Sequence, residues 1–169
     1  GDKISVVVID EQINDNNKIG SSLIKELLAK GFIKEANNLL GRYFKLSGYI
    51  IHGKNIGEKI KVPTANLKIE YDSVILKEGV YAGYCYVLGR KYNAICNIGH
   101  NPSFNYRNNL SYEIHILDNE FNDKIYDEFV ELELVEYLRE EVVFQNITEF
   151  QKQIVVDKKR AISILNNAL

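Results

Sequence analysis

The chain has 169 residues and a formal net charge of −2, with 46% hydrophobic and 26% charged residues. This is the length and composition of one globular domain that can bury a core, which excludes intrinsic disorder for most of the chain. The near balance of acids and bases argues against a nucleic-acid partner, and no apolar run reaches the roughly 20 residues of a membrane span.

The N-terminal forty residues differ from the rest of the chain in the spacing of their apolar residues. Apolar residues recur at helical spacing after residue 20, so we predict two short helices here. Ser21 or Ser22 is the predicted cap of the first helix, Gly31 its end, and Gly41 the end of the second. The predicted N-terminal elements are a buried strand over 3–9, a polar loop over 10–18, and helices over 21–31 and 32–40.

From residue 43 onward the pattern becomes β, rich in aromatic and β-branched residues and punctuated by Gly, Asn, Asp and Pro. Gly89 and Arg90 predict a tight hairpin turn, and a break in alternation at Val135 and Glu136 predicts a bulge. Alternation with one polar face favours antiparallel pairing, so we predict a mainly β fold, a six-stranded antiparallel barrel of Greek-key or split type. The predicted strands are 43–52, 62–69, 79–88, 91–98, 111–117 and 126–138.

A helix is predicted at the C-terminal end of the chain. Thr148 and Gln151 form a capping-box pattern, in which Thr148 caps the helix and Gln151 reaches back. The apolar residues that follow share one broad stripe, which we expect to dock on the barrel. They are Phe150, Ile154, Ala161, Leu165 and Ala168.

Sulfur-containing residues also constrain the interpretation. Cys85 and Cys96 lie in apolar alternating segments, which indicates buried, reduced thiols and suits a cytoplasmic protein. Together with the three His residues they show no zinc-binding spacing, so no structural metal is expected. The chain has no Met, not even at residue 1, which we interpret as the mark of a fragment, of a processed product or of a chain from which a tag was cleaved.

The first segment that could carry chemistry is residues 52–67, HGKNIGEKIKVPTANL, which begins with a loop that contains two glycines and three lysines. Backbone N–H groups of a Gly-containing loop can hold phosphate oxygens, and nearby lysines add positive charge. The loop lacks the Gly-Lys-Ser/Thr ending of a Walker A motif, and a solvated hairpin has the same composition. The residues concerned are Gly53, Lys54, Gly57, Lys59 and Lys61.

Pro63, Thr64, Ala65 and Asn66 follow directly. If this segment enters a strand, Thr64 and Asn66 point to the same face. A hydroxyl and an amide oxygen are hard, neutral ligands, which Mg²⁺ accepts when phosphates and water complete its shell. A turn-initiating Pro before two solvated polar residues explains the same pattern.

A third segment places Glu113 and His115 on one face of a strand and Ile114 and Ile116 on the other. A neighbouring Glu and His can orient a substrate hydroxyl and take its proton. The exposed polar face of an edge strand gives the same alternation, so this segment is informative only together with the other two.

In this order, and with these spacings, the segments from about residue 41 to residue 165 resemble the riboflavin kinase family. The resemblance rests on an ordered set of motifs, each weak by itself. They are the HGKNIG loop leading into Pro-Thr-Ala-Asn, Gly79-Val80-Tyr81, Asn97-Ile98-Gly99 with Asn101-Pro102, Glu113-Ile114-His115, and Leu138-Arg139 with Phe144.

The resemblance implies transfer of the γ-phosphoryl group of ATP to the 5′-hydroxyl of riboflavin, giving FMN and ADP, with Mg²⁺ bound to the nucleotide. Glu113 is the implied catalytic base, and Thr64 and Asn66 the residues that face Mg²⁺–ATP. Arg139 is a candidate flavin contact, although an ion pair with a nearby Glu explains it equally well. The implied ATP-binding residues are Gly53, Lys54, Gly57, Lys59, Pro63, Thr64 and Asn66, and the implied flavin-binding residues are Arg139, Asn97 and His115.

Two further features are a departure from the family pattern at Lys61 and a second resemblance near the N-terminus. Lys61 stands where the family usually has Gly, which either restricts the phosphate loop or adds charge to it. Residues 19–25 resemble the end of the FMN adenylyltransferase module that precedes the kinase module in bacterial FAD synthetases. We therefore interpret 1–40 as the tail of that module and 41–169 as the kinase barrel with its last helix, without adenylyltransferase activity.

Two other functions stay open at this stage. One is a flavin- or nucleotide-binding module that has lost turnover, and Lys61 is the residue that motivates it. The other is a split-barrel flavoprotein that binds FMN for redox chemistry.

Overall fold

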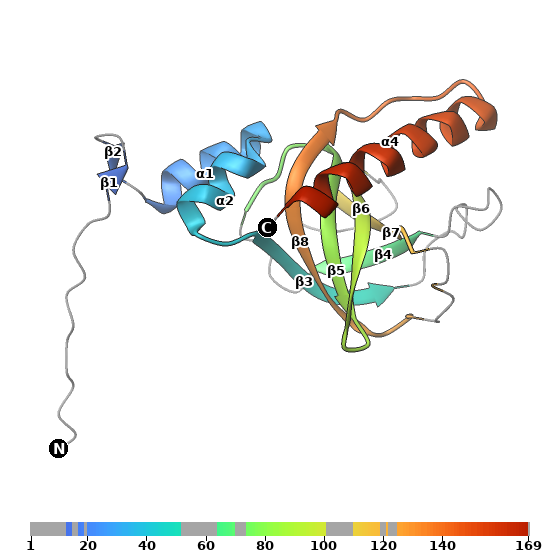
Figure 1. Ribbon diagram of the computed structural model, residues 1–169, viewed down its shortest axis with the longest axis horizontal. Coiled ribbons are helices and arrows are strands. Elements are labelled where there is room, and N and C mark those ends of the chain that lie inside the picture. The colour runs from blue at the N-terminus through green and yellow to red at the C-terminus, as the bar shows by residue number, and fades with distance from the viewer. Residues whose placement is uncertain are drawn as a thin grey trace, which may run out of the picture.

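The computed structural model describes residues 13–14, 17–18, 20–51, 64–69, 74–100, 110–118, 121 and 125–168 (Figure 1). The strand predicted over 3–9 and the phosphate loop lie outside these residues. Within the stretch predicted as a loop, β1 (Ile13–Asn14) pairs antiparallel with β2 (Asn17–Lys18), so the expectation of a loop over 10–18 was wrong there.

Two short helices follow, α1 (Ser21–Lys30) and α2 (Ile33–Leu40). The predicted serine cap is wrong: α1 already includes Ser21, and its N-cap is Gly20, which has no side chain to accept a hydrogen bond. The predicted ends are confirmed, because Gly31 (φ 81°) and Gly41 (φ 65°) adopt the left-handed conformation. Glycine adopts it without a Cβ penalty, which is why helices so often end there.

Six described strands close into an antiparallel barrel in the order β3-β4-β7-β6-β5-β8, which confirms the predicted fold class. Aromatic and β-branched residues fill these strands, and each strand pairs with two neighbours, so the barrel has no free sheet edge. The strands are β3 (Phe44–Ile51), β4 (Ala65–Ile69), β5 (Gly79–Val87), β6 (Arg90–His100), β7 (Leu110–Ile116) and β8 (Phe129–Arg139).

The β5–β6 turn is one residue earlier than predicted. Val87 pairs with Arg90, so the two turn residues are Leu88 (φ 52°) and Gly89 (φ 71°). A two-residue hairpin turn with positive φ at both positions matches the twist of the flanking strands. Gly89 therefore takes the second turn position, and Arg90 belongs to the strand.

The bulge predicted in the last strand is confirmed. Ala82 pairs with Glu136 and Gly83 with Leu134, which leaves Val135 as the extra residue on β8. The extra residue faces outward, where Val135 is buried against the outer cluster of apolar side chains.

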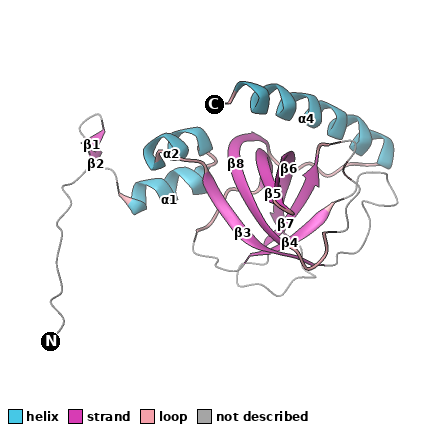
Figure 2. Cartoon of the chain, turned by 60° about the horizontal axis from the view of Figure 1, so that its bottom comes forward, coloured by secondary structure: helices cyan, strands magenta, loops and turns pink. Residues whose placement is uncertain are grey.

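The barrel has an apolar interior and a second apolar cluster on its outer face. Leu28, Ile33 and Ala36 of α1 and α2 belong to the interior cluster, together with Tyr81 and Leu132 of the strands. The two N-terminal helices therefore complete the core at one end of the barrel, beside β3 and β8 (Figure 2).

The C-terminal helix α4 (Ile147–Asn167) lies across the outside of the barrel over β5, β6 and β8 (Figure 2). Its buried Ala161 and Leu165 pack on the outer cluster, as the predicted stripe required. The predicted cap is wrong by two residues: Asn146 is the N-cap and its Oδ1 accepts from Glu149 N at 3.0 Å. No helix among the described residues is long and apolar enough to cross a membrane.

Candidate active site

Five neighbouring strands align a row of residues across the outer face of the barrel. Asn66 pairs with Glu113, Glu113 with Asn97, Asn97 with Val80, and Val80 with Arg139. Directly paired residues share one face of a sheet, and four inter-strand steps of about 4.8 Å span about 19 Å of curved sheet. The row therefore brings the predicted metal-binding, catalytic and flavin-binding residues onto one surface.

Arg139 joins this row because of a second bulge, which the sequence pattern did not indicate. Tyr81 pairs with Tyr137, and Val80 pairs with Arg139, so Leu138 is an extra residue on β8. Without it, strand alternation would turn Arg139 toward the barrel interior, where Tyr81 and Tyr137 contact each other at 5.1 Å between ring centroids. The bulge thus directs the guanidinium to the outer face.

A pocket of about 370 Å³ lies between this outer face and α4. Its lining combines polar and apolar side chains from the strands, from the segment after β8 and from the first turns of α4. Its polar residues include Thr64, Asn97, Glu113, His115 and Glu141, and its apolar wall includes Val80, Ile95, Val142, Val143, Phe144, Phe150 and Ile154.

Glu113 is half-buried in the wall of the pocket. Burial, and next the nearby Glu141 carboxylate, raise the pKa of Glu113 above its usual value. Both effects disfavour the charged form and so make the carboxylate a better proton acceptor once it is ionised. His115, two residues along the same strand, is buried and lines the pocket as well.

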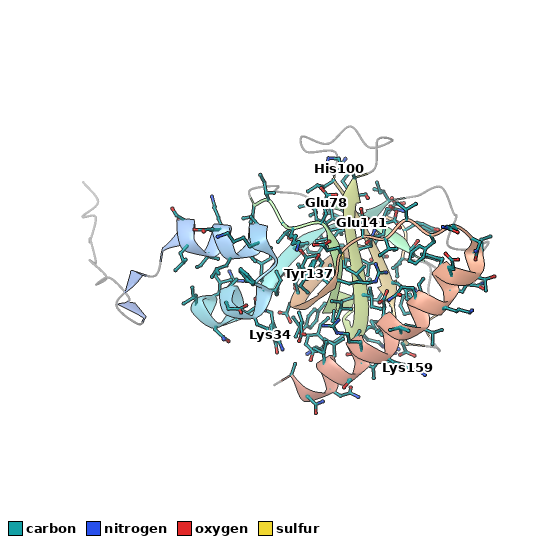
Figure 3. The ribbon with its side chains drawn as sticks, turned by 90° about the horizontal axis from the view of Figure 1, so that it is seen from above. Lys34, Glu78, His100, Tyr137, Glu141 and Lys159 are labelled. Carbon is teal, nitrogen blue, oxygen red and sulfur yellow. The ribbon has the colours of Figure 1, made fainter. Side chains whose placement is uncertain are left out.

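The side chain of Asn97 is hydrogen-bonded to a glutamate that also lines the pocket. Its Nδ2 donates to Oε1 of Glu141 at 2.9 Å. The Glu141 carboxylate lies over Gly99, where a Cβ would come within 2.0 Å of Oε1. Figure 3 labels Glu141 near His100 at the same end of β6. Glu141 was not among the predicted site residues, because it follows the last strand in a run of two glutamates that has no pattern of its own.

Arg139 forms an ion pair with Asp157 of α4, and its shortest contact is Nη2 to Oδ2 at 2.7 Å. An ion pair with a glutamate was the expected alternative; the partner is an aspartate, and Arg139 lines the pocket at the same time. Sequence analysis also missed Asp157. A usable signal was present, because Asp157 stands between Ile154 and Ala161 on the apolar stripe, where a charge requires a buried partner.

The strand predicted over 62–69 begins at Ala65 in the described part of the chain, so Asn66 lies in β4 and Thr64 directly precedes it. Thr64 lines the pocket, whereas Asn66 lies beside Glu113 outside the pocket wall. The buried Oδ1 of Asn66 has no hydrogen-bond partner among the described residues. An unsatisfied buried oxygen next to a hydroxyl and a carboxylate fits a hard cation such as Mg²⁺.

The remaining predicted site residues lie outside the described residues, so their roles stay predictions. They are Gly53, Lys54, Gly57, Lys59 and Pro63, together with Lys61, the departure from the family pattern.

Comparison with known proteins agrees with this geometry. A model of the riboflavin kinase family matches residues 40–165. The bifunctional riboflavin kinase/FMN adenylyltransferase of Bacillus subtilis is 34% identical over 167 residues, 98% of this chain and 52% of that protein. The enzyme of the same name from Listeria monocytogenes is 34% identical over 157 residues, 93% of this chain and 49% of that protein. The chain therefore spans about half the length of these curated relatives.

Two solved structures are also similar. One, titled a macrolide-efflux protein from Streptococcus pneumoniae, has a TM-score of 0.80 at 27% identity and covers 90% of this chain and 49% of its own. Riboflavin kinase from Trypanosoma brucei has a TM-score of 0.55 at 20% identity, covering 73% of this chain and 78% of its own. At that identity the second likeness shows the fold alone.

Proposed function

The chain belongs to the riboflavin kinase family, and we propose that it transfers the γ-phosphoryl group of ATP to the 5′-hydroxyl of riboflavin. The products are FMN and ADP. The observation that carries the proposal is Glu113, a half-buried carboxylate in the wall of a pocket that also holds Thr64 and Arg139. A family match that covers the whole barrel supports it.

Phosphoryl transfer depends mainly on position and on neutralising charge, so few residues are required. Glu113 accepts the proton of the riboflavin hydroxyl as the bond to phosphorus forms, and its raised pKa suits that role. Thr64 and Asn66 hold the nucleotide end of the site, and the unsatisfied Oδ1 of Asn66 supports this placement. Mg²⁺, when bound there, supplies positive charge to the phosphates.

The flavin ring takes the other end of the pocket. Val142, Phe144, Phe150 and Ile154 provide an apolar wall for a flat ring system, and Arg139 provides donors at its edge. Asn97 and His115 line the same pocket and are the proposed contacts of the ribityl chain or the ring. The loop over 52–63, with Gly53, Lys54, Gly57, Lys59 and Pro63, covers the phosphates of ATP.

A second part of the proposal concerns residues 1–40. The curated relatives are bifunctional and about twice as long, so these residues are the tail of an adenylyltransferase module joined to the kinase module over 41–169. Because α1 and α2 contribute apolar side chains to the barrel core, this tail is packed on the kinase barrel from Ser21 onward. Cys85 and Cys96, both free and buried, support a cytoplasmic location.

One incubation tests the proposal. The chain is mixed with ATP, Mg²⁺ and riboflavin, and FMN is separated from FAD by chromatography. We expect FMN without FAD. Binding of ATP without any FMN would favour the catalytically impaired module, and a bound flavin that undergoes hydride reduction would favour the redox flavoprotein. Formation of FAD by this chain would refute the assignment of residues 1–40.

A further inference from the structure

We propose that Asp157 is a positioning residue for the flavin end of the pocket. It fixes the Arg139 guanidinium in the pocket wall, and through Arg139 it sets the affinity for the planar ring of the acceptor substrate. The inference rests on the proposed function, since that ring is the isoalloxazine of riboflavin.

Asp157 lies on the barrel-facing side of α4 and is only 5% exposed. Its two carboxylate oxygens accept from Arg139 in a fork: Nε contacts Oδ1 at 3.1 Å and Oδ2 at 3.0 Å, and Nη2 contacts Oδ2 at 2.7 Å. Paired, charge-assisted bonds of this kind fix the plane of a guanidinium as well as its place.

The neighbours of the pair complete its orientation. Gln153, one turn before Asp157 on α4, donates from Nε2 to Oδ1 at 2.9 Å. Nη1 of Arg139 donates to the carbonyl oxygen of Glu140 at 2.8 Å. Among the described residues, these contacts use three of the five N–H groups of an arginine, and one N–H on each terminal nitrogen is left for a ligand.

Arg139 also reaches the aromatic wall. Its Cζ lies 5.9 Å from the Phe144 ring centroid, and Phe144 meets Phe150 edge-on at 5.4 Å. A fixed cation and two aromatic rings therefore form one corner of the pocket. A planar heterocycle with carbonyl groups at its edge can stack in such a corner and accept from the free N–H groups.

The docking of α4 does not rest on this pair alone. Ala161 and Leu165 already bury the C-terminal half of α4 against the barrel. Removing two charges from water costs free energy, and apolar residues of similar size often stabilise as well as a buried ion pair. An ion pair retained in the pocket wall is better explained by what it holds in place.

Without the Asp157 charge, Arg139 keeps its side chain but loses its fixed orientation. The riboflavin ring then binds a mobile guanidinium, and we expect its affinity to fall roughly tenfold or more. The nucleotide end lies at the other end of the row, at Thr64 and Asn66, so the KM for ATP should stay within about twofold.

The test compares Asp157→Asn with Leu165→Ala. Both changes weaken the docking of α4, but Leu165 is buried away from the pocket. Riboflavin affinity is measured by quenching of flavin fluorescence, with and without ADP and Mg²⁺, alongside the KM values for both substrates and thermal unfolding. We expect weaker riboflavin binding only in Asp157→Asn.

A double variant, Arg139→Met with Asp157→Leu, covers the case in which Asp157→Asn does not fold. It removes both charges, so it should fold and still lose riboflavin affinity. Equal riboflavin affinity in wild type and in either Asp157 variant would overturn the proposal, as would an equal loss in Leu165→Ala. A wild-type protein that binds riboflavin but forms no FMN would refute the kinase assignment alone, because the binding comparison does not use turnover.

Discussion

Asn66 on β4 lies directly opposite Glu113 on β7, and the buried Oδ1 of Asn66 has no hydrogen-bond partner among the described residues. A buried acceptor without a donor is costly to a folded protein. Its place beside the proposed base indicates that the cost is offset when a ligand binds. The pair therefore links the nucleotide end of the site to the residue that takes the proton.

Asn66→Ala should weaken nucleotide binding without weakening the fold. The variant removes an unsatisfied oxygen, so thermal unfolding should be unchanged or slightly higher in temperature. The KM for Mg²⁺–ATP should rise roughly tenfold, as for one lost charge-assisted contact. Steady-state kinetics at varied ATP and Mg²⁺ measure this, with Lys68→Ala on the same strand as the exposed control. A destabilised variant with an unchanged KM would contradict the ligand role.

Glu113→Gln should remove most FMN formation. Loss of a general base typically costs about 10²–10⁴-fold in rate. Stability near neutral pH should not fall, because burial already disfavours the charged carboxylate. Turnover and thermal unfolding are measured together, with Glu128→Gln as a control on an exposed glutamate. Near-normal turnover in Glu113→Gln would reject this residue as the base.

The pH dependence follows from the same pKa. Glu113 must be ionised to accept a proton, so kcat/KM for riboflavin should rise with pH through a value above that of an ordinary glutamate. Glu141 contributes to the raised pKa, so Glu141→Gln should shift this rise to lower pH while it can still accept from Asn97. A rise that does not move in Glu141→Gln would show that Glu141 has no part in it.

The free energy of unfolding should change with pH in the opposite direction to activity. The folded protein holds the Glu113 proton to higher pH than the unfolded chain does. The contribution of Glu113 to the free energy of unfolding is therefore full at low pH and is lost as pH rises through the raised pKa. Urea unfolding at a series of pH values should show this slope in wild type and not in Glu113→Gln.

The fold could be read from the sequence where the signal is local. Gly31 and Gly41 end helices because the left-handed conformation is open to glycine, and the break at Val135 marks an extra residue in its strand. The predictions of the N-cap residues were wrong because an N-cap is the residue at which the chain enters helical geometry. Gly20 and Asn146 take those positions, and no periodic pattern distinguishes them from their neighbours.

The site divides in the same way. Strand periodicity placed Glu113 and His115 on one face, and both line the pocket. Glu141 and Asp157 were missed because they follow the last strand, and their positions depend on how α4 docks across the barrel. The second bulge, at Leu138, shows only in the pairing register of β5 and β8. The local sequence pattern therefore could not predict the direction of the Arg139 guanidinium.

Asn37 provides the last prediction, which concerns the joint between α2 and the barrel. Its buried side chain donates from Nδ2 to the carbonyl oxygen of Leu134 at 2.9 Å, and its Oδ1 accepts from Phe44 N at 2.7 Å. The same amide thus ties α2 to two strands. Asn37→Ala leaves the buried carbonyl of Leu134 and the half-buried N–H of Phe44 without these partners, which should cost about 2–4 kcal/mol, because water can reach the half-buried N–H and replace part of what is lost.

Asn38→Ala makes the same change one residue later, on the exposed side of α2, and serves as the matched control. Urea unfolding should show a lower midpoint for Asn37→Ala with an unchanged slope, and little change for Asn38→Ala. Riboflavin and ATP KM values should stay the same in both, because α2 packs at the end of the barrel away from the pocket. Equal midpoints for the two variants would mean that the two Asn37 hydrogen bonds do not contribute to holding α2 on the barrel, and that apolar packing alone docks this helix.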